Sequence, residues 1–138
     1  MEPSINDFFK RFGKNTTSNI QLINFANQLK MKPFKVIMRD ETKLVTNKDY
    51  VIGNIHESSE KGVHWYCFHD KYFFDSYGLP PCNEVKEKIS PGIYSEFNIQ
   101  TFEQKFCGTI CFYVLYMMYK GNSFEDVVLY LYKIKEKL

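Results

Sequence analysis

The chain has little glycine, little proline and almost no excess of one charge. Its 138 residues include 7 Gly and 5 Pro, and 18 Lys and Arg against 16 Asp and Glu leave a net charge of +2. With 44% hydrophobic residues, this composition excludes collagen-like, low-complexity and disordered chains. The small net charge gives no overall attraction to nucleic acid. Residues 1–138 are expected to form one domain, long enough to bury a core without disulfides or metals.

Long hydrophobic runs are also missing. The longest, Ile110–Tyr119, has ten residues, whereas a membrane-spanning helix needs about 20. No basic segment followed by an apolar one begins the chain, so we expect no signal peptide. The sequence therefore predicts an intracellular monomer with no membrane partner.

The four cysteines form no CxxC pair, and in a reducing compartment they are expected to be thiols. Cys67 alternates away from His64 in its predicted strand and is expected in the core. His64, Cys67 and His69 lack the ligand spacing of zinc fingers and ribbons. We therefore expect no metal and no cofactor.

The spacing of apolar residues, and the Ser, Gly and Pro residues that begin or end helices and strands, define the expected elements. Helices are predicted over residues 4–12, 18–30, 84–89, 107–120 and 124–137, strands over 34–38, 50–55, 63–69, 72–77 and 93–99, and a polar loop over 40–49. Helices at both ends around several short strands predict an α+β fold. In it, a central helix packs against a small mixed or antiparallel sheet.

The hairpin of this sheet brings two titratable residues together. If Asp70-Lys71 is its two-residue connection, His64 stands opposite Tyr77 and diagonal to Asp75 on one face. A four-residue connection places His64 directly opposite Asp75, and a three-residue connection separates them onto opposite faces. The alternative is that both are polar groups on a solvent-exposed face.

Cys107 opens the apolar helix and is followed by Gly108. The positive end of the helix dipole favours a thiolate at this position, and Gly108 lets a substrate backbone approach closely. The alternative for Cys107 is a small buried hydrophobic residue.

A thiol, an imidazole and a carboxylate together are the parts of a Cys-His-Asp peptidase. Cys107 attacks the carbonyl carbon, His64 transfers the proton and Asp75 orients the imidazole. The Cys107 N–H is one donor for the oxyanion. A neutral amide is another, and both Gln100 and Gln104 precede the cysteine.

Four motifs in this order resemble the adenovirus-type endopeptidases (adenains) and their relatives in Polinton elements. More distantly, they are similar to SUMO and ubiquitin-like-protein proteases. Residues 62–65 (GVHW) resemble the histidine strand, residues 72–78 (YFFDSYG) the acid strand, and residues 107–111 (CGTIC) the nucleophile helix. Adenains place the oxyanion glutamine seven residues before the nucleophile, which here is Gln100. Residues 34–41 resemble the Polinton members less specifically, and the likeness covers about residues 34–120.

The resemblance implies a papain-like or adenain-like architecture and cleavage after small residues, at Gly-Gly or Gly-X sites. It implies maturation of viral or mobile-element capsid precursors, in the host nucleus or cytoplasm or inside virions. It places Trp65 beside the catalytic histidine, as a substrate-binding residue together with Gly108; packing in the core is the alternative for Trp65.

The resemblance also implies activation by a peptide or by DNA. For DNA the available cations are Lys10, Arg11, Lys14, Lys30, Lys32 and Lys35. They form either a basic patch or ordinary solvated charge. Two other functions remain open, a deubiquitinase or SUMO-type protease and a catalytically inactive binding module with the same fold.

Overall fold

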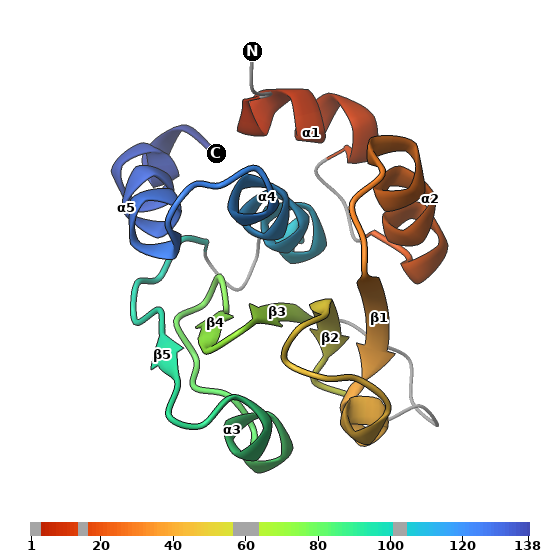
Figure 1. Cartoon of the computed structure of the whole chain (residues 1–138). Coiled ribbons are helices and arrows are strands. Elements are labelled where there is room, and N and C mark those ends of the chain that lie inside the picture. Colours follow the sequence, from red (N-terminus) through yellow and green to blue (C-terminus); the bar gives the residue numbers. More distant parts are fainter. Residues whose placement is uncertain (1–3, 14–16, 57–63, 101–104) are drawn as a thin grey trace.

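One mixed sheet of five strands, in the order β1-β2-β3-β4-β5, lies between two groups of helices (Figure 1). The computed structural model describes residues 4–13, 17–56, 64–100 and 105–138. The expected α+β class, with helices near both ends of the chain and a small mixed sheet, is confirmed.

The sheet has an antiparallel centre and parallel edges. It comprises β1 (Phe34–Met38), β2 (Tyr50–Asn54), β3 (Trp65–His69), β4 (Tyr72–Phe74) and β5 (Ile93–Tyr94). The pairs β2-β3 and β3-β4 are antiparallel, and β1-β2 and β4-β5 are parallel. The prediction of a strand over residues 93–99 is wrong beyond Tyr94. There the chain leaves the sheet, and the Ile99 N–H donates to the Ser76 carbonyl oxygen at 2.7 Å.

The β3-β4 hairpin has the two-residue connection expected from the sequence. His69 pairs with Tyr72 and Cys67 with Phe74. Asp70 occupies the connection with φ 56°, a left-handed conformation that aspartate tolerates. β4 ends at Phe74, earlier than predicted, because Asp75 starts a turn in which its carbonyl oxygen accepts from the Gly78 N–H at 2.9 Å.

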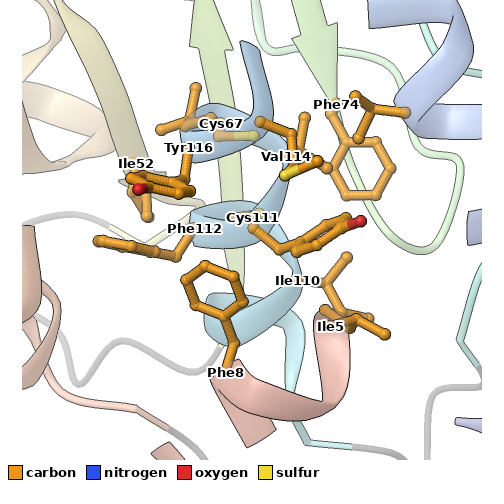
Figure 2. Packing of buried hydrophobic residues seen from close by; sticks show 14 of the residues in the cluster. Ile5, Phe8, Ile52, Cys67, Phe74, Ile110, Cys111, Phe112, Val114 and Tyr116 are labelled. Atoms are coloured by element: carbon orange, nitrogen blue, oxygen red, sulfur yellow. The ribbon is translucent and has the colours of Figure 1, made fainter. Parts of the chain in front are cut away.

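The main core lies where α4 (Cys107–Tyr119) crosses one face of the sheet. Every residue from Cys107 to Met117 is buried, as its apolar sequence predicts. Figure 2 shows Phe112 of α4 between Ile52 of the sheet and Phe8 of α1 (Ile5–Phe12). The centroids of the Phe8 and Phe112 rings lie 5.8 Å apart. This packing fixes the start of α4 against the sheet.

Helical segments also cover the opposite face of the sheet (Figure 1). They are α3 (Asn83–Ile89) and a 3-10 helix (Arg39–Leu44), packed with Tyr66, Phe68 and Phe73. The polar loop predicted over residues 40–49 is therefore wrong in its first half. The Glu41 carboxylate accepts from the Met38 N–H at 2.8 Å and closes this turn, a local side-chain bond that apolar periodicity does not reveal.

The remaining helices begin at the expected caps. The Gln21 N–H donates to Ser18 Oγ at the start of α2 (Asn19–Leu29), and the Asp126 N–H donates to Ser123 Oγ at the start of α5 (Phe124–Ile134), both at 3.1 Å. The last helix was predicted to Lys137; instead its final residues, Lys135–Lys137, form a 3-10 turn.

Candidate active site

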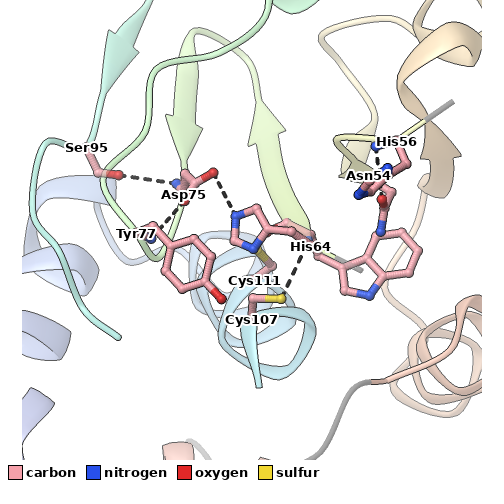
Figure 3. A network of polar contacts seen from close by, with 9 residues as sticks. Asn54, His56, His64, Asp75, Tyr77, Ser95, Cys107 and Cys111 are labelled. Carbon is pink, nitrogen blue, oxygen red and sulfur yellow. Dashed lines mark hydrogen bonds and ion pairs between the residues drawn. The ribbon is translucent and has the colours of Figure 1, made fainter. Parts of the chain in front are cut away.

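The start of β3, the end of β4 and the start of α4 lie together at one end of the sheet. His64 directly precedes β3, Asp75 directly follows β4, and Cys107 is the first residue of α4. The His64 carbonyl oxygen accepts from the Ile55 N–H at 3.1 Å, which continues the β2-β3 pairing by one residue. The hairpin register predicted that His64 reaches Asp75, and the structure brings the two side chains together (Figure 3).

A buried hydrogen bond joins the imidazole to the carboxylate. His64 Nε2 lies 2.9 Å from Asp75 Oδ2, and the two side chains are 4% and 2% exposed. The second carboxylate oxygen, Oδ1, accepts from the Tyr77 N–H at 2.7 Å. The solvent-exposed placement that was the alternative for this pair is therefore wrong. Among the described residues, helical segments pack on the sheet face that carries Tyr66, so this face is not open to solvent.

The sulfur of Cys107 lies beside the other edge of the imidazole (Figure 3). Its Sγ accepts from the Trp65 N–H at 3.3 Å, which holds the sulfur at the start of β3. Nδ1 of His64 makes no hydrogen bond of standard geometry within the described residues. The sulfur is nevertheless close enough to change the pKa of His64. Contacts between nucleophile and base are often long in unliganded enzymes.

The environment of His64 favours the protonated ring. Burial alone lowers its pKa, but the hydrogen bond to Asp75, the nearby Cys107 sulfur and the negative charge of both groups outweigh burial and raise the pKa from 6.5 to about 9. His64 is therefore an imidazolium at neutral pH, between two groups that stabilise its positive charge.

Tyr77 is a site residue to which the sequence assigned no role. Its ring stacks on His64, with centroids 4.2 Å apart and planes at 10° (Figure 3). The predicted register placed Tyr77 opposite His64, so the signal was present, but opposite positions on a hairpin do not reveal a stacked geometry. Ser95 was also missed. Its Oγ accepts from the Asp75 N–H at 3.4 Å, a contact between the ends of the neighbouring strands β4 and β5 with no local sequence signal.

Gln100 joins the site through Tyr77. Gln100 is buried, and its N–H donates to the Ser76 carbonyl oxygen at 3.1 Å. Its side-chain amide lies close enough to the Tyr77 hydroxyl to act on the pKa of that group, which it lowers. The other candidate amide, Gln104, lies outside the described residues.

Trp65 and Gly108, predicted to bind substrate, contact the chain itself. The Trp65 indole is buried, and its Nε1 donates to the Thr17 carbonyl oxygen at 3.1 Å. A Cβ added to Gly108 would collide with Thr17 Oγ1 and lie 2.9 Å from Trp65 Cδ1. The close approach at Gly108 is therefore made by Thr17 and Trp65 in this structure, and substrate binding by Gly108 stays a prediction.

A second thiol, Cys111, lies one helical turn after Cys107 in α4. Cys111 Sγ donates to the Trp65 carbonyl oxygen at 3.6 Å, and burial raises the Cys111 pKa well above its ordinary value. Cys111 therefore stays a neutral thiol. Cys67 packs in the core, as expected. All four cysteines are free thiols. Within the described part of the chain, no group of three or more His, Cys, Asp or Glu side chains is arranged to hold a metal ion.

The cations suggested for DNA binding lie on several elements. Lys10, Lys30, Lys32 and Lys35 are exposed, and Lys14 lies outside the described residues. Arg11 is held by Gln28 Oε1 at 2.6 Å and lies over the Phe25 ring, 5.2 Å from its centroid.

Comparison with known proteins places the chain in no group: no family model matches it, and no curated protein matches it. Among the described helices, none has the length and apolar character to cross a bilayer.

Proposed function

We propose that this protein is a cysteine endopeptidase of adenain-like, papain-like architecture, in which Cys107, His64 and Asp75 form the catalytic triad. The observation that carries the proposal is the buried 2.9 Å bond between His64 Nε2 and Asp75 Oδ2. Because Nε2 bonds Asp75, the other ring nitrogen, Nδ1, is the one that can exchange a proton with the Cys107 sulfur at the start of α4. An orienting carboxylate, a base and a nucleophile in series are the requirement for thiol-based acyl transfer.

The chemistry follows from the charges of these groups. The Cys107 thiolate attacks the scissile carbonyl carbon, and the carbonyl oxygen becomes an oxyanion. The His64 imidazolium gives a proton to the amine leaving group, and a thioester remains on Cys107. His64, now neutral, takes a proton from water as the water attacks the thioester, which releases the acid product and restores the thiolate. Asp75 stays ionised and stabilises the imidazolium throughout.

Two donors are available for the oxyanion. The Cys107 N–H belongs to the first turn of α4, where N–H groups have no acceptor within the helix. The Gln100 side-chain amide is the second. The backbone N–H of Gln100 donates to the Ser76 carbonyl oxygen, and its side-chain amide lies near the Tyr77 hydroxyl, which supports this assignment. The proposed role of Trp65 is to hold the Cys107 sulfur in place, because its backbone N–H donates to Cys107 Sγ.

The substrate class follows from the family resemblance. We propose cleavage after small residues, at Gly-Gly or Gly-X sites of viral or mobile-element capsid precursors, by an enzyme that works inside the host cell or the virion. A peptide or DNA activator belongs to the same proposal. A deubiquitinase or SUMO-type protease has the same chemistry, and the substrates separate the two: a ubiquitin-like C-terminus against a capsid-type peptide.

A catalytically inactive module is the second candidate, and a specific observation favours it. Cys107 is only 2% exposed, so a peptide reaches the sulfur only after neighbouring groups move. A thiol-reactive activity probe separates the candidates. Labelling of Cys107, alone or after addition of a peptide or DNA activator, supports the peptidase, whereas a probe that never labels it supports the module.

Cleavage of fluorogenic Gly-Gly peptides tests the enzyme directly. Cys107→Ala is expected to abolish cleavage and to leave the circular dichroism spectrum unchanged. Gln100→Ala is expected to reduce kcat by about 10²–10³, the usual cost of losing one oxyanion donor. Gln104→Ala is the matched control, with a much smaller effect expected. Equal losses in the two glutamine variants contradict the assignment of Gln100.

A further inference from the structure

One turn at the end of β4 holds both the acid and the proposed oxyanion amide. The Tyr77 N–H donates to Asp75 Oδ1 at 2.7 Å, so the turn orients the carboxylate that faces His64. The next carbonyl oxygen, that of Ser76, accepts from the Gln100 N–H at 3.1 Å. The same four-residue turn thereby ties Gln100 to the triad, although 25 positions separate Asp75 from Gln100.

Tyr77 is the side chain of this turn that touches both parts of the site. Its ring lies parallel to the His64 imidazole at 4.2 Å. Its hydroxyl points toward the start of α4 (Figure 3), and the Gln100 amide lies close enough to this hydroxyl to lower its pKa. Burial, followed by negative charge on Cys107 and Asp75, raises the Tyr77 pKa, so the hydroxyl is protonated at neutral pH.

The amide chemistry permits this arrangement. A glutamine side chain carries two N–H donors. One N–H can donate to the Tyr77 oxygen while the second is directed at an oxyanion. A bond from the first N–H to the hydroxyl would restrict rotation of the amide, and preorganised donors stabilise a developing charge without further rearrangement.

We propose that Tyr77 is a positioning residue, whose hydroxyl orients the Gln100 amide toward the oxyanion and whose ring holds the His64 imidazole in plane. This inference rests on the proposed peptidase function. A ring that only fills space is the competing explanation, and it predicts that Tyr77→Phe, which keeps the ring and removes the hydroxyl, has no kinetic effect.

A double-mutant cycle on the full-length chain tests the hydroxyl. Tyr77→Phe is expected to lower kcat on a Gly-Gly fluorogenic peptide about tenfold with KM nearly constant, because the donor is misplaced and not removed. In a Gln100→Ala background the same change is expected to alter kcat less than about twofold, since the two residues act as one unit. Tyr119→Phe is the matched control. It removes a hydroxyl that donates to the Lys30 carbonyl oxygen at 3.0 Å, away from the site.

The outcomes are distinguishable. An active wild type with Tyr77→Phe equally active, or with losses that multiply in the double variant, overturns the inference and leaves the peptidase intact. A wild type that cleaves nothing, both alone and with a peptide or DNA activator, overturns the peptidase, and the inference with it. A second measurement follows the ring: Tyr77→Leu is expected to slow Cys107 alkylation by iodoacetamide more than Tyr77→Phe does, and equal alkylation rates contradict the stacking role.

Discussion

Replacing Asp75 by asparagine isolates the charge that holds His64 protonated. The substitution keeps the shape of the side chain and removes its charge. The rise of the His64 pKa from 6.5 to about 9 corresponds to about 3 kcal/mol of interaction with the protonated ring. Without the carboxylate, burial still lowers the His64 pKa, and only Cys107 is left to raise it. An opposite charge at this distance changes a pKa by about 1–3, so we expect the ring to be neutral at pH 8 in Asp75→Asn.

The assay is an NMR pH titration of the His64 ring, whose signal is identified by its loss in His64→Gln. The wild-type midpoint is expected near 9, and that of Asp75→Asn well below it. Asp70→Asn, on the exposed hairpin connection, is the matched control and is expected to leave the midpoint unchanged. An unchanged midpoint in Asp75→Asn refutes the claim that Asp75 holds the proton on His64.

The same pKa change has a consequence for stability. Because the folded pKa of His64 lies above the unfolded value, its stabilising effect is complete below pH 6.5 and disappears as the pH rises through about 9. The difference in unfolding free energy between wild type and Asp75→Asn is therefore expected to shrink between pH 6.5 and 10. Urea denaturation at several pH values measures it, and a difference that grows with pH contradicts this linkage.

Three further predictions concern packing and reactivity. Gly108→Ala is expected to destabilise the fold by about 1–3 kcal/mol because its Cβ meets Thr17 Oγ1; urea denaturation should detect partial rescue by Thr17→Ala, and no rescue contradicts the contact. Cys111→Ala is expected to leave iodoacetamide labelling of Cys107 unchanged, measured by mass spectrometry, since the deeper thiol is neutral. Ser123→Ala removes the α5 cap and is expected to cost about 1 kcal/mol in urea denaturation, with no change in labelling.

The sequence predicted those parts of the site that depend on local geometry. Strand alternation and a two-residue connection were enough to bring His64 to Asp75, and an apolar run with a preceding break located Cys107 at a helix start. These signals lie within one hairpin or one helix, where the spacing of apolar residues and the residues of the turn determine the local structure.

Contacts between distant segments were not predictable in this way. The collision that fixes Gly108 involves Thr17, and the Asp75 N–H reaches Ser95 Oγ, which follows the neighbouring strand β5. Apolar periodicity carries no information on such contacts, because they depend on which segments the fold brings together.

His64 and Asp75 lie 11 positions apart on one hairpin, whereas the hydrogen bond from the Trp65 N–H to Cys107 Sγ spans 42 positions. Closing the longer loop costs more chain entropy, by about 0.6 kcal/mol for each doubling of length. The sulfur reaches the hairpin only because the interior around α4 holds that helix in place. Damage to that interior, which also packs against the hairpin, is therefore expected to displace the Cys107 sulfur from His64 more than it displaces Asp75, because the imidazole and the carboxylate are joined within one hairpin.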